Sequence, residues 1–267
     1  MKARLDKFLV ERGLVPSRER AQALILAGRV LVNEQKVEKP GAAVAEDAAV
    51  RLLGDDLRYV SRGGLKLEAA LAHWQIDLGG RVCADVGAST GGFSDCMLQH
   101  GAARVVAIDT GYGQIAHKLR VDPRVRLLER TNARNLTRED LQAEQATVPV
   151  TFAAMPITFL AMDVSFISAT LVLPSVARAM PELTEMVVLV KPQFEAGREH
   201  VGKGGIVRDP EAHRLAVDRV RAAVAELGGE GIEVMDSPIL GAEGNREFLL
   251  HARFAMTHRN RPLLPLD

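Results

Sequence analysis

The sequence predicts an α/β protein in which a Rossmann-like, seven-stranded sheet follows a small N-terminal α+β module. Three observations support this fold class. Apolar strand-like runs alternate with helix-like runs from about residue 59 onward, which is typical of a parallel sheet covered on both faces. A turn of small residues joins the first of these strands to a helix. The beginning of the chain has its own pattern of helices and turns, so we expect domains at 1–58 and 59–267.

The N-terminal module begins with two predicted helices. Residues 4–13 place their apolar side chains on one helical stripe, and Gly13 ends the helix. Ser17 is a suitable N-cap for a second helix that ends at Gly28. Alternating valines then predict a β-hairpin. The module is therefore expected to fold as a compact unit of helices and short strands.

The charges of the chain are unevenly distributed, although its net charge is zero. Residues 1–66 contain 13 Lys and Arg against 9 Asp and Glu, which gives +4, so residues 67–267 carry −4. A basic module attached to an acidic domain suggests RNA binding, although an ordinary solvated helix face has the same composition. The candidate RNA-contacting residues are Arg4, Lys7, Arg18, Arg20, Arg62 and Lys203.

Beyond a short joint at 54–58, helix and strand patterns alternate to the end of the chain. Helices are predicted near 64–76, 91–100, 113–119, 137–145, 168–180 and 210–227. Strands are predicted near 81–87, 104–109, 125–130, 157–163, 185–191, 231–238 and 248–254. Because the last two strands have only a short connection, we expect them to pair antiparallel. Ligands of such sheets bind beyond the carboxyl ends of the strands.

Composition argues against several other classes of protein. The 267 residues are 47% hydrophobic, which suffices for a sizeable core. No run of 18 apolar residues predicts a transmembrane helix, and the first residues lack an apolar signal-peptide segment. Cys83 and Cys96 are expected to be core thiols of a protein in the reducing cytoplasm. No Cys/His spacing predicts a metal site.

Residues 83–93, CADVGASTGGF, form the cofactor motif. A strand runs into a turn of small residues that opens a helix, whose free N–H groups can bind an anionic group. The spacing fits neither the dinucleotide fingerprint nor the P-loop. The next strand ends in Asp109, about 20 residues further on, where a carboxylate can accept hydrogen bonds from both hydroxyls of an adenosine ribose. The motif favours S-adenosylmethionine, although such glycines also serve packing alone.

Seven-stranded sheets of this kind are the common architecture of S-adenosylmethionine-dependent methyltransferases. Four charged residues, Lys66, Asp163, Lys191 and Glu247, are expected at the rim of the sheet, around the cofactor pocket. A ribose hydroxyl is a poor nucleophile, so methylating it requires a group that takes or steers its proton. Each residue alone could equally be an ordinary charge. The predicted cofactor-binding residues are Asp85, Gly87, Ser89, Thr90, Gly91, Gly92, Phe93, Asp109, Asn132 and Asp163.

These motifs resemble those of known families. Residues 4–50, with the pattern S-R-x-x-A-x-x-L-I-x-x-G-x-V-x-V-N, resemble the alpha-L RNA-binding module of a small-subunit ribosomal protein. Residues 4–254 resemble the TlyA/hemolysin A family of ribosomal RNA 2′-O-methyltransferases, whose catalytic domain is related to FtsJ-type RNA methyltransferases. The matching stretches are SRGGLKL at 61–67, DVGASTGGF at 85–93, DTGYGQ at 109–114, ERTNAR at 129–134, DVSFIS at 163–168 and VKPQFE at 190–195.

The resemblance implies S-adenosylmethionine-dependent 2′-O-methylation of a cytidine in 23S and/or 16S ribosomal RNA. It also implies that the four charged residues are the family's catalytic tetrad. Two departures bear on the target: residues 135–159 look longer than in the family, and the tail after Phe254 lacks the added helix that accompanies a broader target range. We therefore expect a preference for 23S rRNA. The oligomeric state is not predicted.

Several roles stay open at this point. Lys191 either accepts the hydroxyl proton, which requires a neutral amine, or orients the hydroxyl beside Asp163. The basic, glycine-rich loop 197–208 is either a lid over a flipped-out nucleotide or a surface loop. Phe166 either stacks on the target base or, as we expect, packs in the core. The alternatives to an enzyme are a ribosome-binding protein that holds the cofactor without turnover and a membrane-active haemolysin.

Overall fold

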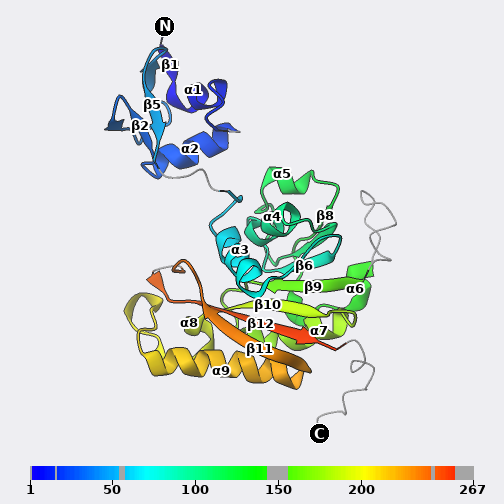
Figure 1. Ribbon diagram of the computed structural model, residues 1–267. Coiled ribbons are helices and arrows are strands. Elements are labelled where there is room, and N and C mark those ends of the chain that lie inside the picture. Colours follow the sequence, from blue (N-terminus) through cyan, green and yellow to red (C-terminus); the bar gives the residue numbers. More distant parts are fainter. Residues whose placement is uncertain (1, 16, 54–57, 143–155, 242–243, 256–267) are drawn as a thin grey trace. The chain divides into compact units, whose positions relative to one another are not determined.

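The computed structural model describes residues 2–15, 17–53, 58–142, 156–241 and 244–255 (Figure 1). The chain divides into two compact units, Met1–Arg58 and Tyr59–Asp267, and each is described by itself. Most of the predicted joint, the middle of the long segment 135–159 and the tail beyond residue 255 lie outside the described residues.

The first unit packs two helices against short strands. Its core consists of apolar residues from both helices together with Val15, Val30 and Val44. The hairpin turn joins two strands through Asn33 and Glu34, whose φ angles of 50° and 61° suit a two-residue turn of the primed type. Ser17 accepts a hydrogen bond from the backbone of the second helix, as predicted. The elements are β1 (Lys2–Arg4), α1 (Leu5–Glu11), α2 (Arg18–Leu26), β2 (Val30–Val32), β3 (Gln35–Lys36), β4 (Ala43–Ala45) and β5 (Val50–Leu52).

The second unit contains the large sheet and the helices that cover it. The strands are β6 (Val82–Val86), β7 (Arg104–Ile108), β8 (Val125–Leu128), β9 (Ile157–Met162), β10 (Glu185–Val190), β11 (Gly229–Asp236) and β12 (Phe248–Phe254). The α-helices are α3 (Gly63–Trp74), α4 (Gly92–Gln99), α5 (His117–Arg120), α6 (Arg138–Gln142), α7 (Leu173–Ala179), α8 (Pro192–Glu195) and α9 (Pro210–Glu226). Short 3-10 helices are η1 (Ala133–Asn135), η3 (Ala169–Leu171), η4 (Arg198–His200) and η5 (Lys203–Gly205).

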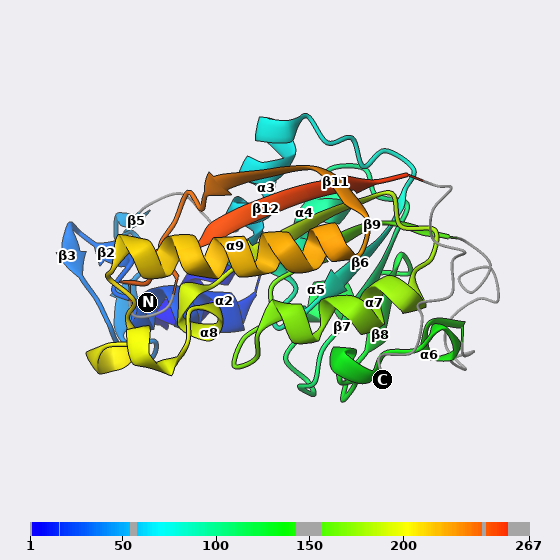
Figure 2. The ribbon, with the colours of Figure 1, turned by 90° about the horizontal axis from the view of Figure 1, so that it is seen from below.

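The seven strands form one sheet in the order β11-β12-β10-β9-β6-β7-β8 (Figure 2). Strands β6 to β10 pair parallel wherever they are neighbours, and β12 lies antiparallel to both β10 and β11. The predicted antiparallel pairing of the last two strands is therefore confirmed. Because the five parallel strands run the same way, their carboxyl ends meet at one edge of the sheet.

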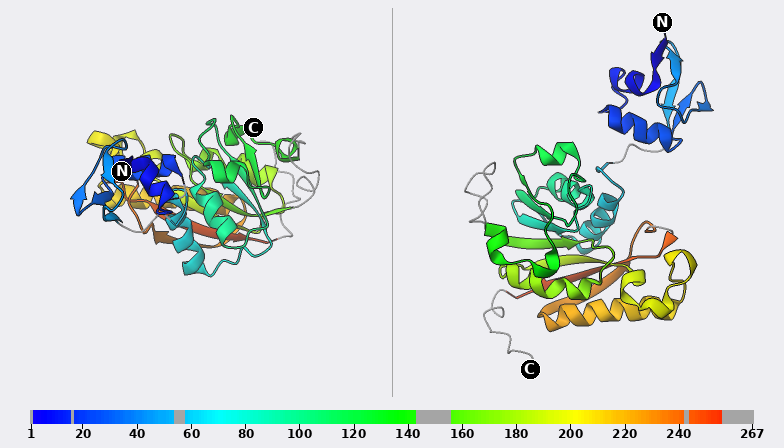
Figure 3. Two further views of the ribbon diagram at one scale, coloured as in Figure 1. Left: turned by 90° about the horizontal axis from the view of Figure 1, so that it is seen from above. Right: turned by 180° about the vertical axis from the view of Figure 1, so that it is seen from behind.

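Both faces of the sheet are covered, which explains why its strands are almost continuously apolar. Along β6, Val82, Ala84 and Val86 face a core shared with α7 and α9. Cys83, between them, faces a second core that contains residues of α3 and α4. Figure 3 shows these two helical layers on opposite sides of the sheet. Cys83 and Cys96 are both buried and free, as expected for core thiols.

The structure shortens or splits several predicted elements. The helix predicted at 113–119 is confined to α5, because Gly113 takes a φ of 71° and donates its N–H to Glu129 at 2.8 Å. The strand predicted at 125–130 ends at Leu128, since Arg130 takes a φ of 54°. The helix predicted at 168–180 is divided into η3 and α7. Residues 143–145 of another predicted helix lie outside the described residues.

Candidate active site

Two adjoining cavities lie beyond the carboxyl ends of the parallel strands. The first, of about 260 Å³, is lined by the glycine turn after β6, the start of α3 and the segment Ile239–Gly241. The second, of about 320 Å³, is lined by the ends of β7 and β9 and by residues around Asn132. Gly87, Ser89 and Asp163 line both cavities. The two cavities therefore form one recess large enough for a nucleoside with an attached side chain.

The glycine turn after β6 brings the backbone close to its surroundings. Gly87 has a φ of 86°, and a Cβ atom there would lie 2.3 Å from the carbonyl oxygen of Asp163. Gly91, with a φ of 94°, is the N-cap of α4, and its Cβ atom would lie 2.2 Å from a methyl carbon of Leu119. The positive φ angles favour glycine at both positions, and at Gly87 the backbone of Asp163 also leaves no space for a side chain.

Asp85 is buried at the base of the first cavity. Its Oδ2 atom accepts hydrogen bonds from the backbone N–H of Ser94 at 2.8 Å and from the Ser94 hydroxyl at 2.6 Å. Its Oδ1 atom has no hydrogen-bond partner among the described residues. Burial raises the pKa of Asp85 to about 7. A buried carboxylate oxygen without a donor suits a cationic ligand group, such as the ammonium of the predicted cofactor.

Asp109 and Asn132 line the second cavity. The carboxylate of Asp109 is fixed by two backbone groups, because Oδ2 accepts from Ser89 N at 2.7 Å and Oδ1 accepts from Gly111 N at 2.6 Å. Each oxygen keeps a second lone pair, which suits the ribose hydroxyls that the sequence predicts here. The Asn132 side-chain oxygen accepts from Arg134 N at 3.0 Å and caps η1.

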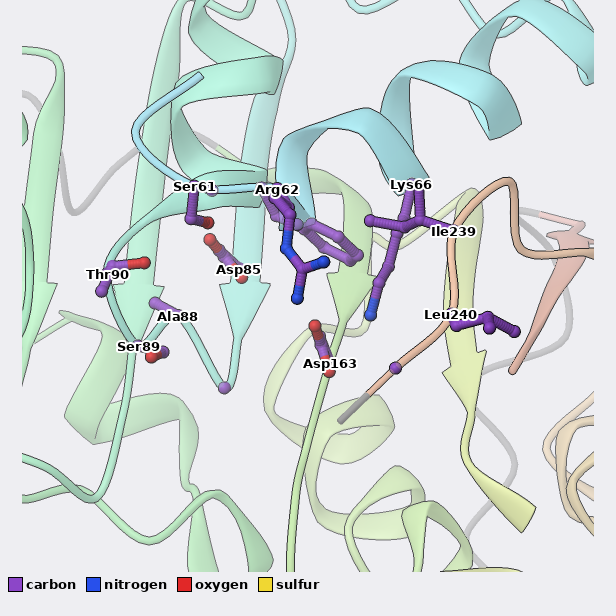
Figure 4. A pocket seen from close by; sticks show the side chains of 15 residues that line it. Ser61, Arg62, Lys66, Asp85, Ala88, Ser89, Thr90, Asp163, Ile239 and Leu240 are labelled. Carbon is purple, nitrogen blue, oxygen red and sulfur yellow. The ribbon is translucent and has the colours of Figure 1, made fainter. Parts of the chain in front are cut away.

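The four charged residues of the predicted tetrad form two ion pairs. Lys66 Nζ, on α3, lies 2.5 Å from Glu247 Oε2, just before β12. Lys191 Nζ, at the end of β10, lies 2.5 Å from Asp163 Oδ1, at the end of β9, and donates to Ser165 Oγ at 2.7 Å. Figure 4 shows Lys66 and Asp163 pointing toward a common space in the first cavity.

The sequence did not identify the segment Ile239–Gly241 as part of the site. Its residues line the first cavity beside Lys66. A Cβ atom on Gly241 would lie 2.1 Å from Glu247 Oε1, so this segment packs directly on the carboxylate that holds Lys66. The sequence around residues 239–241 looks like that of an ordinary turn. Its place at the cavity follows only from the fold.

Phe166 is 93% exposed, so the prediction that it packs in the core is wrong. The segment after β9 is held on both sides of it, by the Lys191 bond to Ser165 and by Glu195, which accepts from Ser168 Oγ at 2.5 Å and Ala169 N at 2.7 Å. Between these anchors Phe166 takes a φ of 64°, its ring centroid lies 5.6 Å from that of Phe194, and it lines the second cavity. The physical cause of its exposure is this constrained turn.

Buried Asn245 anchors one end of the loop at 197–208. Its Oδ1 accepts from Val207 N at 3.0 Å, and its Nδ2 donates to Gly205 O at 2.9 Å. The Nε2 of His213, also buried, lies 2.9 Å from Val207 O and donates to it. Lys203, one of the candidate RNA-contacting residues, is exposed in this loop. Whether the loop moves as a lid stays a prediction.

The other candidate RNA-contacting residues lie in both units. In the first unit, Arg4 and Arg18 are exposed and both bind the buried carboxylate of Asp6, Lys7 is exposed and Arg20 is half-buried. In the second unit, Arg62 lines the first cavity, beside Lys66 (Figure 4). Their roles stay predictions, but Arg62 is the candidate that reaches the recess itself.

The described ranges contain neither a candidate metal site nor a candidate membrane-spanning helix. Within them, no three His, Cys, Asp or Glu side chains gather in a way that could hold a metal ion. No helix there combines the length and the apolar character that crossing a bilayer requires.

Comparison with known proteins gives consistent results for the two units. Residues 59–254 match the family model of the FtsJ-like methyltransferase, and residues 3–50 match the S4 domain. The chain is 44% identical to the 16S/23S rRNA (cytidine-2′-O)-methyltransferase TlyA of Mycobacterium tuberculosis, over 94% of this chain and 90% of that protein. It is 39% identical to Hemolysin A of Brachyspira hyodysenteriae, over 93% and 98%. A solved structure from Streptococcus thermophilus, described as a hemolysin, superposes with a TM-score of 0.68 at 42% identity, over 95% and 88%.

Proposed function

The chain belongs to the FtsJ-like methyltransferase family and carries an N-terminal S4 domain, and from this premise we propose that it methylates the 2′-hydroxyl of a cytidine in ribosomal RNA. The relative from Mycobacterium tuberculosis is named for this reaction. The observation that carries the proposal is the arrangement of two Lys–carboxylate pairs at the recess. Lys66 and Asp163 line the same cavity as Gly87 and are ion-paired with Glu247 and Lys191, respectively.

The recess fits S-adenosylmethionine, the methyl donor that we propose. Bound there, this cofactor supplies an electrophilic methyl group on a sulfonium. The unpaired oxygen of Asp85 would accept from its ammonium group, and the glycine turn with the start of α4 would hold its methionine part. Asp109 would accept from its ribose hydroxyls, and Asn132 would lie beside its adenine.

We propose that Lys191, which directly follows β10 and pairs with Asp163, orients the 2′-hydroxyl. An ammonium has three N–H donors. Ser165 accepts one of them, and Asp163 Oδ1 lies 2.5 Å from Nζ as an ion-pair partner. A remaining donor would hold the 2′-oxygen toward the methyl group that the cofactor supplies, and the hydroxyl proton would pass to water. A neutral Lys191 that accepts the proton itself is the second route, and it would leave only two N–H donors for these contacts.

The RNA would be bound by surfaces of both units. The S4 domain matches residues 3–50, which include the four candidate RNA-contacting residues of the first unit. Exposed Phe166 lies at the second cavity and offers an open aromatic face on which a flipped-out cytosine would stack. A ribosomal RNA substrate places the activity in the cytoplasm.

The reaction and the target are tested together with labelled S-adenosylmethionine and separated, unmodified 30S and 50S subunits. After digestion of the rRNA to nucleosides, we expect label in 2′-O-methylcytidine from 50S subunits, in keeping with the preference for 23S rRNA. Label from 30S subunits would overturn that preference and leave the reaction standing. No label, with the cofactor still bound, would instead favour a ribosome-binding protein without turnover.

A further inference from the structure

Asp6 is a buried acid at the centre of a cluster of basic and polar side chains in the first unit. It lies in the first turn of α1 and its side chain is 0% exposed. It accepts hydrogen bonds from Arg4 Nε at 3.1 Å and Nη2 at 3.0 Å, and from Arg18 Nε at 2.9 Å and Gln22 Nε2 at 3.0 Å. One carboxylate thus holds two guanidinium groups from different elements, β1 and α2.

The two arginines remain open to solvent although Asp6 holds them. Their side chains are 51% and 47% exposed. Asp6 uses Nε and Nη2 of Arg4 but only Nε of Arg18, so Nη1 of Arg4 and both Nη atoms of Arg18 are not used by it. The group of three carries a net charge of +1. In this group Asp6 fixes the guanidinium planes, while the N–H donors that Asp6 does not use remain available. Such an arrangement suits bidentate hydrogen bonding to a phosphate.

The carboxylate of Asp6 stays ionised over the physiological range. The hydrogen bond from Arg4 holds the pKa of this group well below its usual value and outweighs burial, which acts in the opposite direction. The arrangement is therefore permanent and does not switch with pH.

We propose that Asp6 is a positioning residue that fixes Arg4 and Arg18 as one clamp for a backbone phosphate of RNA. This inference rests on the proposed function, since it assumes that the S4 domain binds RNA. Long arginine side chains lose rotamer freedom when they bind a phosphate, and Asp6 imposes that loss when the unit folds. The competing view is that Asp6 merely neutralises positive charge. The two views predict opposite changes in RNA affinity when the charge of Asp6 is removed.

The test compares two full-length variants that each remove one negative charge from α1. Asp6→Asn removes the carboxylate that holds the arginines, whereas Glu11→Gln removes an exposed carboxylate at the end of the same helix. Their affinities for a 23S rRNA transcript are measured by filter binding at several salt concentrations. If charge alone mattered, both variants would bind more tightly than the wild type.

The clamp predicts that Asp6→Asn binds roughly tenfold more weakly, although it is more positive, while Glu11→Gln binds at least as tightly as the wild type. The slope of log affinity against log salt should fall by about one in Asp6→Asn alone. Affinity for S-adenosylmethionine, which belongs to the second unit, should not change. Asp6→Asn binding as tightly as Glu11→Gln would overturn the clamp.

A second pair of variants keeps the test decisive if Asp6→Asn fails to fold. Arg4→Lys and Arg18→Lys preserve the charge but remove the planar fork that Asp6 orients. The clamp predicts that each weakens RNA binding, and wild-type affinity in both would overturn it. Absence of RNA binding by the wild type would instead refute the proposed function, so the two failures are distinguishable.

Discussion

The Nζ atom of Lys66 lies 2.5 Å from Oε2 of Glu247, although 181 positions separate the two residues. Lys66 stands on α3, near the start of the second unit, and Glu247 directly precedes β12, the last strand of the sheet. Their side chains are only 10% and 2% exposed. The pair therefore joins the start and the end of the methyltransferase fold at the wall of the first cavity, and each charge depends on the other.

Replacing either residue of this pair should destabilise the second unit. Replacing both should lower the free energy of unfolding by less than the sum of the two single effects. Lys66→Met or Glu247→Gln alone leaves a buried charge unpaired and should lower the free energy of unfolding by about 3 kcal/mol, whereas the double variant leaves none. Trp74, the single tryptophan of the chain, lies on α3 and reports the unfolding of this unit in urea by its fluorescence. The control is Asp236→Asn, which breaks an exposed pair with Arg246 and should cost less than about 1 kcal/mol. Strictly additive effects would refute the coupling.

The stability of the ligand-free protein should fall as the pH rises toward 7, because of Asp85. Burial raises the pKa of this group to about 7 in the folded state, above its value of 3.8 in the unfolded chain. The folded state therefore binds the proton more tightly, and the resulting stability is complete below pH 3.8 and is lost as the pH rises through about 7. The slope should reach up to about 1.4 kcal/mol per pH unit.

Asp85→Asn should remove this dependence, which Trp74 fluorescence in urea measures at a series of pH values. The wild type should also bind S-adenosylmethionine more tightly as the pH rises from 6 to 8, since the cofactor ammonium requires the ionised carboxylate. Calorimetric titration of both proteins checks this. An unchanged pH profile of stability and binding in Asp85→Asn would show that Asp85 is not the responsible group.

Gly87→Ala should be far more damaging than Gly80→Ala, although both glycines have positive φ angles of 86° and 71°. At Gly80 nothing lies within 4 Å of an added Cβ atom, so only conformational strain of about 1 kcal/mol is expected. At Gly87 the added atom would meet the backbone of Asp163, which must move. We expect Gly80→Ala to keep wild-type cofactor affinity, measured by calorimetry, and Gly87→Ala to lose it. Equal affinities in the two variants would contradict this account of the turn.

Asn245→Ala should loosen the loop at 197–208 without weakening cofactor binding. The substitution removes the acceptor for Val207 N–H and the donor to Gly205 O. Trypsin should then cleave faster at Arg198, Lys203 and Arg208, and the KM for RNA should rise several-fold. Asn245→Asp keeps the acceptor and loses the donor, so its cleavage rates should lie between those of the wild type and of Asn245→Ala. Unchanged cleavage rates in Asn245→Ala would mean that other contacts hold the loop.

The sheet and most of the site could be predicted because they depend on local pattern and on one topological rule. Apolar runs mark the strands, and parallel strands bring their carboxyl ends together. This suffices to place Asp85, Asp109, Asp163 and Lys191 near one another, as the structure shows.

Features that depend on distant contacts could not be predicted. Phe166 has an apolar side chain, so the sequence alone favours burial. Its exposure depends on contacts that hold Ser165 and Ser168, and the neighbouring residues do not reveal these contacts. Asp6 likewise looks like an ordinary first-turn acid, because Arg18 and Gln22, which bind it, lie on another helix. In both cases the decisive contact comes from a different element.

The most direct test of the central claim is methyl transfer by Lys191→Ala, measured beside its affinity for S-adenosylmethionine. Labelled cofactor and unmodified 50S subunits are incubated with the wild type, with Lys191→Ala and with Lys118→Ala, which removes an exposed lysine of α5 that lines neither cavity. We predict that Lys191→Ala produces no labelled 2′-O-methylcytidine while binding the cofactor within a few-fold of the wild type, and that Lys118→Ala retains transfer. Full transfer by Lys191→Ala, or loss of its cofactor binding, would contradict the role assigned to Lys191.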